Sequence, residues 1–172
     1  TFRVSDGIAT SSSATVSITV TSVNDVPTAT AQSVTGNEDA TQTITLAGSD
    51  LDGDNLTYTL ALNSSNGTAS LSGNTVTYTP NANYSGSDSF TFKVGDGTAT
   101  SSSATVSITL SAVNDAPTLV NIGNQSAAEG QSLSLSLSGS DVDGDALTYS
   151  VSGNPSGSSL TGPTFGWTPG LS

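Results

Sequence analysis

A long internal repeat constrains the fold of this chain more than any other feature of its sequence. Residues 1–20 read TFRVSDGIATSSSATVSITV and residues 91–110 read TFKVGDGTATSSSATVSITL, so the first copy differs only at positions 3, 5, 8 and 20. The match continues into VNDVP at 23–27 and VNDAP at 113–117. The spacing of 90 residues between the copies is the size of one small β-sandwich, so the chain is predicted to contain tandem sandwich domains.

Apolar residues alternate with Ser and Thr along most of the chain. Val16, Ile18 and Val20 alternate in this way, and residues 56–62, 90–94, 106–110 and 133–137 follow the same pattern. A period of two is typical of strands with one buried and one solvated face. Gly, Asn, Asp and Ser separate these segments at short intervals, as turns require. The predicted fold is all-β, with antiparallel Greek-key sandwiches and no helices.

Two Asn-Asp-X-Pro segments mark the expected domain boundaries. Proline lacks the backbone donor that a central strand needs, so it marks a strand edge or a junction. Residues 1–25 are therefore predicted to be the last two strands of a preceding repeat. Residues 26–115 are predicted to form a complete sandwich, and residues 116–172 a repeat that lacks its last strands.

The two partial repeats are complementary, because 116–172 lacks the strands that 1–25 supplies. Ten residues separate Pro80 from Thr91, whereas three follow Pro169, so joining the end to the start would leave a gap of seven. This gap favours a segment of a longer tandem array. The alternative is a subunit whose first strands complete the sandwich of a neighbouring copy by strand addition.

The composition excludes several classes of function. Fourteen acidic residues face two basic ones, and the net charge is −12. Binding to nucleic acid or to anionic membranes needs the opposite charge. The chain has no cysteine and no histidine, so disulfides, zinc thiolates and Ser-His-Asp catalysis are impossible. No apolar run reaches the 18 residues of a membrane span. We expect a protein without enzymatic activity.

Two acidic turns of the same design are candidate calcium sites. Asp50-Leu-Asp-Gly-Asp54 recurs as Asp141-Val-Asp-Gly-Asp145, with carboxylates on alternate residues around a glycine. Two unit charges ~4 Å apart repel by roughly 4 kcal/mol at an effective dielectric of 20. A cation would offset this repulsion, and clustered oxygen ligands suit Ca²⁺. The alternative is a solvated turn. An EF-hand is excluded, because its twelfth position holds Ala61 or Ser152 in place of Glu.

The combined motifs resemble bacterial cadherin-like, immunoglobulin-like tandem repeats. The resemblance rests on the VNDAPT junction, the DxDGDxLTY turn and YTPNANYSGSDSFTFKVGDG at 78–97. Residues 118–169, which include AEG at 128–130 and FGWTP at 165–169, resemble the dystroglycan-type cadherin-like variant. The resemblance implies a large extracellular protein, such as a bacterial adhesin or matrix component, that calcium stabilises.

In that family calcium is held by a Glu near the first strand, an Asn-Asp linker, a DxD turn and an Asp after a late strand. The matching residues here are Glu38, Asn24 and Asp25, Asn114 and Asp115, Asp50 and Asp52, Asp141 and Asp143, and Asp96. The Asp-Arg-Glu motif of true cadherins has no counterpart, which favours one or two ions per junction over three.

The expected topology brings these residues together at the junctions. Loops of an antiparallel sandwich alternate between its two ends, so the acidic turn and the loop at residue 96 share one end with the linker. One junction would gather Asp25, Asp50, Asp52, Asp54 and Asp96, and the next would gather Glu38, Asp115, Asp141, Asp143 and Asp145. An ion at each junction would stiffen a flexible linker.

The predicted function is a structural or adhesive segment of a secreted or cell-surface bacterial protein: a stalk, matrix fibre or filament. Its predicted partners are neighbouring repeats, with glycans as a further possibility. The alternative function is a carbohydrate-binding module attached to a polysaccharide-acting protein. For that alternative, Tyr84 is the best candidate for an exposed ring, whereas Trp167 is expected to pack in the core.

Overall fold

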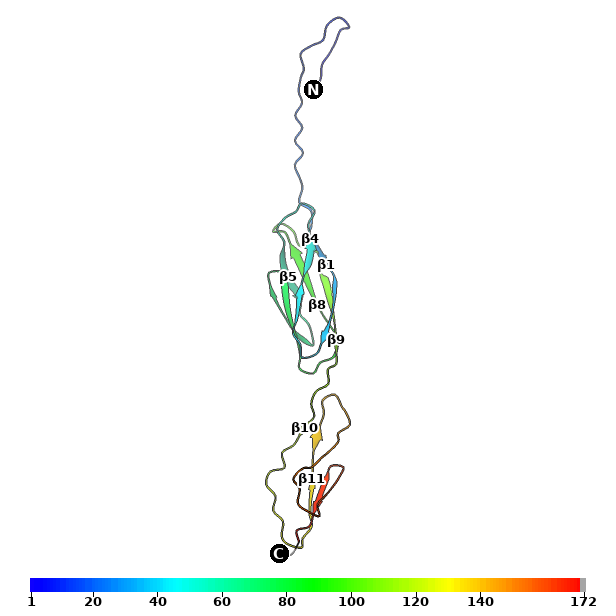
Figure 1. Ribbon diagram of the computed structural model, residues 1–172. Coiled ribbons are helices and arrows are strands. Elements are labelled where there is room, and N and C mark those ends of the chain that lie inside the picture. Colours follow the sequence, from blue (N-terminus) through cyan, green and yellow to red (C-terminus); the bar gives the residue numbers. More distant parts are fainter. Residues whose placement is uncertain (171–172) are drawn as a thin grey trace.

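The computed structural model describes residues 1–170, and the last two residues of the predicted C-terminal unit lie outside this range. Three parts follow one another along a line: an N-terminal arm, a central sandwich and a C-terminal unit (Figure 1). The described residues contain strands and turns but no helix. The predicted all-β, immunoglobulin-like fold is confirmed.

The central sandwich spans residues 28–111. Its strands are β1 (Thr28–Thr30), β2 (Gln32–Asn37), β3 (Gln42–Thr45), β4 (Ala47–Ser49), β5 (Thr57–Leu62), β6 (Gly67–Ser72), β7 (Thr75–Pro80), β8 (Gly86–Gly95) and β9 (Ala104–Ser111). One sheet has the order β2-β9-β8-β5, the facing sheet has the order β3-β7-β6, and β1 pairs with β4. The chain passes from β1 to β2 without reversing its direction, although the two strands belong to different sheets. β2 pairs with β9 in parallel.

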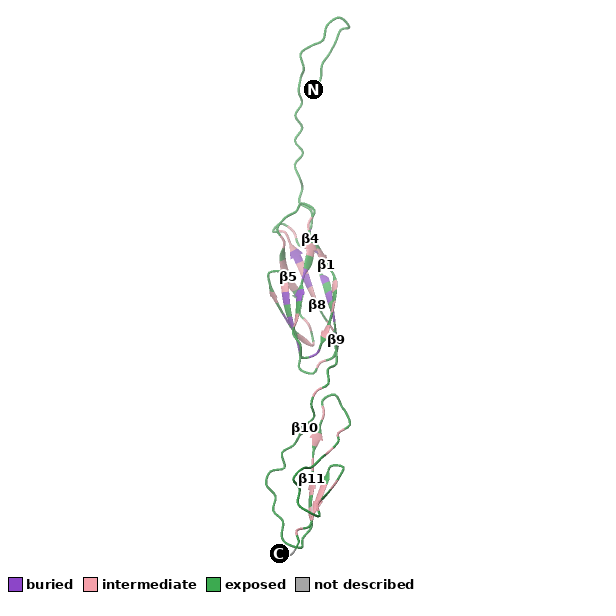
Figure 2. Ribbon diagram, viewed as in Figure 1, coloured by how far each residue is buried: buried purple, intermediate pink, exposed green. Residues whose placement is uncertain are grey.

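The core of the sandwich comes directly from the alternation of its strands. In β9 the side chains of Val106, Ile108 and Leu110 are buried and the intervening Ser and Thr residues are exposed. They form one core with Phe90, Phe92 and Val94 of β8 and with Ile44, Val76 and Tyr78 of the facing sheet. Leu46, between β3 and β4, belongs to the same core. Figure 2 shows the buried residues confined to this central part.

The N-terminal arm, residues 1–25, has the sequence of β8 and β9 but not their structure. Its pairing consists of single antiparallel bridges, Phe2 with Ala14 and Ser5 with Thr10. Residues 16–20, predicted as a strand, form an extended segment without a ladder. A strand needs a neighbour for its backbone groups, and no described segment lies beside this one in a sheet.

The C-terminal unit reproduces half of the sandwich. Its strands are β10 (Thr118–Leu119), β11 (Leu133–Ser136), β12 (Gly139–Ser140), β13 (Ser159–Thr161) and β14 (Thr164–Trp167). Its pairings β10-β12 and β11-β14-β13 correspond to β1-β4 and β3-β7-β6. From residue 111 to residue 170 no residue as a whole is buried. The domain boundaries at 25/26 and 115/116 stay predictions.

Candidate metal centres

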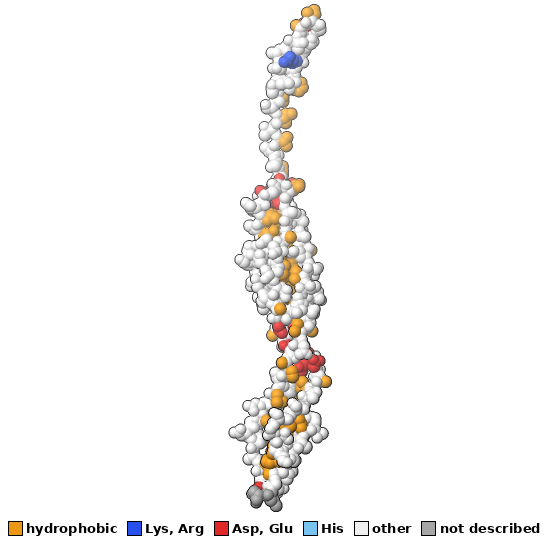
Figure 3. All heavy atoms as spheres, viewed as in Figure 1, with side chains coloured by type: hydrophobic (Ala, Val, Ile, Leu, Met, Phe, Trp, Pro, Cys, Tyr) orange, Lys and Arg blue, Asp and Glu red, His pale blue; other side chains and the backbone are white. Residues whose placement is uncertain are grey.

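Acidic side chains gather at the two ends of the central sandwich (Figure 3). We call the two groups the N-terminal cluster and the C-terminal cluster. The N-terminal cluster consists of Asn24, Asp25, Asp50, Asp52, Asp54 and Asp96, and the C-terminal cluster consists of Glu38, Asn114, Asp115, Asp141, Asp143 and Asp145. In each cluster the linker lies against the acidic turn of the unit that follows it.

In each acidic turn, the side chain of the first aspartate accepts hydrogen bonds from the backbone of the residues that follow it. Asp50 Oδ1 accepts hydrogen bonds from the N–H of Asp52 at 2.9 Å and of Asp54 at 3.4 Å. Asp141 Oδ1 accepts in the same way from Asp143 at 3.0 Å and Asp145 at 3.2 Å. Gly53 and Gly144 lie between them with φ of 79° and 80°, a conformation that favours glycine. Each turn thus curls its carboxylates into a small arc.

The linker docks on the turn in the same way at both junctions. The backbone N–H of Asp25 donates to Asp52 Oδ2 at 2.7 Å, and that of Asp115 donates to Asp143 Oδ2 at 2.7 Å. The preceding asparagine, Asn24 or Asn114, donates its side-chain N–H to the carbonyl of the following Asp at 2.8 Å. The repeated sequence therefore builds the same junction twice.

Asp96 is a member of the N-terminal cluster that has no equivalent in the C-terminal cluster. Its Oδ2 accepts from Asn24 Nδ2 at 3.0 Å, and its Oδ1 accepts from the N–H of Thr98 and Ala99 at 2.6 Å. The hydrogen bond from Ala99, followed by those from Asn24 and Thr98, lowers the pKa of Asp96 below its ordinary value.

In the acidic turn of the N-terminal cluster, one carboxylate oxygen each of Asp50, Asp52 and Asp54 lies within 4.8 Å of the others.

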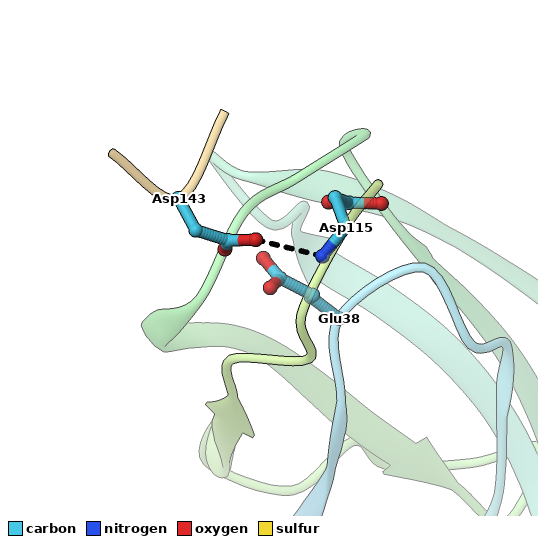
Figure 4. Close-up of side chains that lie close together, drawn as sticks. All are labelled: Glu38, Asp115 and Asp143. Carbon is cyan, nitrogen blue, oxygen red and sulfur yellow. Dashed lines mark hydrogen bonds between the residues drawn. The ribbon is translucent and has the colours of Figure 1, made fainter. Parts of the chain in front are cut away.

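Glu38 is a member of the C-terminal cluster that has no equivalent in the N-terminal cluster. It is 4% exposed, and its Oε1 accepts from the N–H of Val113 at 2.8 Å. One carboxylate oxygen each of Glu38, Asp115 and Asp143 lies within 4.8 Å of the others. Figure 4 shows the carboxylates of Glu38 and Asp143 close to the backbone nitrogen of Asp115. The sandwich, the linker and the C-terminal unit each contribute one member of this trio.

Both clusters contain negative charge that the protein itself leaves uncompensated. Asp50 Oδ2 and Asp115 Oδ2 are buried and have no hydrogen-bond partner among the described residues. Burial raises the pKa of Asp115, and repulsion by Asp39, Asp143, Glu38 and Asp141 raises it further. The basic residues of the chain stand elsewhere: Arg3 in the arm and Lys93 in β8.

The predicted residues do not all contribute in the same way. Asp25 contributes its backbone N–H to the N-terminal cluster. Asp54 belongs to the carboxylate trio of its turn, whereas Asp145 does not belong to the trio of the C-terminal cluster. The prediction omitted Asp39, which adds to the negative potential at Asp115. Asp39 has a φ of 57° and accepts from the N–H of Asn83 at 2.9 Å. Its position next to Glu38 was the signal that could have revealed it.

The aromatic residues offer no exposed platform in the described part of the chain, where Phe2 is the one exposed ring. Tyr84, predicted to be exposed, is half-buried, packs against the core, and donates to the carbonyl of Ser87 at 2.7 Å. Trp167 is half-buried, and its Nε1 donates to the carbonyl of Ser156 at 3.3 Å. Residues 1–170 contain no helix with the length and apolar character of a bilayer span.

Comparison with known proteins places half of the chain in a family. Residues 24–109, which cover nearly all of the central sandwich, match the family model described as Bacterial Ig domain. None of the curated proteins matches the chain.

Solved structures resemble the chain at low identity. An endo-fucoidan hydrolase from glycoside hydrolase family 107 is 21% identical over 84% of this chain, with a TM-score of 0.42. The titin domains Z1Z2, solved in complex with telethonin, are 16% identical over 84% of this chain and 81% of that one, with a TM-score of 0.33. This chain spans 24% of the length of the hydrolase.

Proposed function

This chain belongs to the bacterial Ig domain family, and on that premise we propose that it is a cadherin-like structural segment that calcium stiffens at its junctions. Domains of this family are generally non-catalytic and typically occur in surface or extracellular proteins. The parent protein would be a secreted or cell-surface stalk, matrix fibre or filament, located outside a bacterial cell. Its repeats would hold other parts of that protein at a distance from the surface.

The observation that carries the calcium proposal is the uncompensated charge at both junctions. Asp50 and Asp115 are half-buried, and one oxygen of each, Oδ2, is shielded from solvent without a donor among the described residues. Shielding a carboxylate oxygen costs free energy unless a donor or a metal compensates it. The ligands on offer are carboxylate and amide oxygens, which suit Ca²⁺ better than softer metals. The residues that would hold it are those of the N-terminal and C-terminal clusters. Six to eight oxygens are typical for Ca²⁺, so carbonyls and water would supply the remainder.

Stiffening follows from where the ligands are attached. In the C-terminal cluster Glu38 belongs to the sandwich, Asp115 to the linker and Asp143 to the C-terminal unit. Without a cation, these carboxylates repel one another and favour separation of the three segments. A bound cation would attract all three carboxylates, so the same residues would then hold the junction closed.

The proposal is tested by calcium titration of the whole chain. Extracellular calcium modules bind with Kd of roughly 10⁻⁴–10⁻³ M. An ion present at 100 times its Kd adds about 2.7 kcal/mol to the stability of the form that binds it. We expect calorimetric binding, and a melting temperature that is higher in calcium than in chelator.

A matched pair of variants locates the ion. Glu38→Gln keeps an acceptor for the N–H of Val113 but removes the charge, and it should weaken binding at the junction by about tenfold or more. Glu129→Gln makes the same change at the equivalent position of the C-terminal unit, 91 residues later, and should leave this junction intact. Calcium that neither binds nor shifts the melt, or that acts equally on both variants, would refute the calcium proposal.

The carbohydrate-binding alternative stays a prediction. Such modules use exposed aromatic rings to stack on sugars, and among the described residues only Phe2 is an exposed ring. Binding to a glycan array, lost on Phe2→Ala, would favour this alternative over the structural role.

A further inference from the structure

The chain enters the central sandwich at one end and leaves it at the other. Pro27 precedes β1 at the end that faces the N-terminal arm, and β9 ends at Ser111, beside the linker to the C-terminal unit (Figure 1). Tension along the chain therefore pulls on Pro27 and Ser111 in opposite directions. The strands that hold these two points together determine how much tension the sandwich withstands.

The strand β2, near the start of the sandwich, and its last strand, β9, are direct neighbours. They pair in parallel, in continuous register from Gln32 with Val106 to Asn37 with Ser111. Tension pulls β2 by its first residue and β9 by its last, so the two strands are sheared lengthwise against each other. Ladder hydrogen bonds run from strand to strand, so shear loads all of them together. Two strands that are pulled apart from one end lose them one after another.

The strands next to this pair make the contact between β2 and β9 the decisive one. β1 is three residues long and pairs with β4 alone, so it detaches first and passes the tension to β2. β9 is eight residues long and is also held by β8 on its other side. The sandwich therefore unfolds when β2, an edge strand, slides along β9.

A side-chain amide anchors the start of β2 to the facing sheet. Gln32 Nε2 donates to the carbonyl of Thr45, the last residue of β3, at 3.0 Å. Gln32 Oε1 is shielded from solvent and has no hydrogen-bond partner among the described residues, which costs free energy. The amide ties the first residue of β2 to a strand on which the tension does not act directly.

A buried carboxylate anchors the end of β2. Glu38 directly follows β2 and is 4% exposed. Its N–H donates to the carbonyl of Ser111 at 3.0 Å, and its Oε1 accepts from the N–H of Val113 at 2.8 Å. The side chain thus continues the pairing past the end of β9. Tension from the C-terminal unit reaches Val113 before it reaches β9, so the bond to Glu38 is loaded first.

We propose that the central sandwich is a mechanical element that resists tension along the chain. The parallel pair of β2 and β9 is its shear clamp, and Gln32 and Glu38 hold the two ends of that clamp. This role goes beyond the structural role proposed above, because a spacer has to keep its length but does not have to resist force. The clamp consists of protein contacts and does not require calcium.

Single-molecule pulling on the whole chain in two geometries tests the clamp. In the first geometry the chain is held by its two ends, which shears β2 against β9. In the second it is held by its N-terminal end and by a cysteine introduced as Ser103→Cys. Ser103 is exposed and directly precedes β9, and the natural chain has no cysteine. Because parallel strands begin at the same end, the second geometry separates Gln32 from Val106 first and opens the pairs in turn.

The two geometries are compared in chelator at one loading rate. We expect a severalfold larger unfolding force in the first geometry, because the force needed depends on the rate of the unfolding step, and that step breaks the whole ladder at once. This unfolding should release the segment from Gln32 to Ser111, which at 3.3–3.6 Å per residue is about 260–290 Å of extended chain. Equal forces in the two geometries would overturn the proposal.

A matched pair of substitutions tests the anchor at Glu38. Glu38→Gln keeps an acceptor for the N–H of Val113, whereas Glu38→Ala removes it. In chelator, Glu38→Gln should unfold near the force of the natural chain. Glu38→Ala should unfold at a lower force in the first geometry alone, because a pull on residue 103 loads the opposite end of the clamp. A lower force in both geometries would mean that Glu38 stabilises the fold in general and is not an anchor of the clamp.

The same measurement in calcium separates this inference from the calcium proposal. An ion held by Glu38, Asp115 and Asp143 would add a link at the end of the clamp, so calcium should raise the force in the first geometry. A force that depends on the geometry but not on calcium would contradict the calcium proposal alone. A force that rises in calcium but is equal in the two geometries would contradict the clamp alone.

Discussion

The pairing of Tyr78 with Asp88 shows how single residues hold the sandwich together. The Tyr78 hydroxyl donates to Asp88 Oδ2 at 2.8 Å, and Asp88 also accepts from the N–H groups of Ser65, Asn66 and Ser89. Gly67 lies beneath the ring, and a Cβ there would be 2.6 Å from it. The pair therefore anchors the loop before β6 to β8.

This pair predicts a loss of stability in acid. Burial raises the pKa of Asp88, but the hydrogen bonds from Tyr78 and the three backbone N–H groups outweigh it, so the net shift is downward. A carboxylate with a lowered folded-state pKa contributes stability above its unfolded value, about 3.9. That stability is lost as the pH falls through the lower folded value.

Tyr78→Phe tests the pair, because it removes one of these hydrogen bonds. The variant should cost about 1–2 kcal/mol of unfolding free energy at pH 7. It should also lose less stability than the natural chain between pH 4 and pH 2. Urea unfolding at each pH measures both quantities. Equal pH dependence in the two proteins would show that Tyr78 does not affect the ionisation of Asp88.

At the scale of elements, β9 and the arm segment 14–20 have almost the same sequence and opposite environments. β9 lies between β2 and β8 with its apolar side chains buried, and the arm segment is exposed along its whole length. The alternation of apolar residues makes a strand possible in both places. The presence of neighbours decides which segment becomes one.

This contrast predicts that replacing the equivalent isoleucine by alanine lowers the free energy of unfolding by different amounts in the two segments. Ile108→Ala leaves a cavity in the core and should cost about 2–5 kcal/mol. Ile18→Ala removes an exposed side chain and should change the stability of the dilute monomer by less than about 0.5 kcal/mol. Urea unfolding at low protein concentration compares them. Similar costs at both positions would mean that the arm is packed in the monomer.

At the scale of the whole molecule, the shape depends on the junction at Asn114 and Asp115. The hydrogen bond from Val113 to Glu38 ties the linker to the sandwich, and the one from Asp115 to Asp143 ties it to the C-terminal unit. Both hydrogen bonds are made to carboxylates that repel one another.

Small-angle scattering should detect this dependence. We expect a larger radius of gyration and a narrower range of shapes in calcium than in chelator at the same ionic strength, with samples diluted to the monomer. Asp143→Asn should reduce the difference, because it removes one of the charges that an ion would bridge in the C-terminal cluster and leaves the N-terminal cluster unchanged. Superimposable profiles for the natural chain in the two media would contradict stiffening by calcium.

Much of the candidate site was predictable because its geometry is local. The turn of Asp50, Asp52 and Gly53 is defined within five residues, and the linker follows a proline-marked boundary. Asp39 and the pair of Tyr78 with Asp88 were not predictable, since their effect depends on segments that are distant in the sequence. The half-buried state of Tyr84 has the same origin.

The sequence by itself determined the all-β class, the repeat spacing and the positions of the acidic turns, because alternation and turn residues act over a few neighbours. The tertiary structure alone decided which copy of the repeated segment becomes a strand. It also decided that Glu38 meets Asp143 across more than a hundred residues of chain. A strand and a metal centre both need partners, and partners are brought together only when the chain folds.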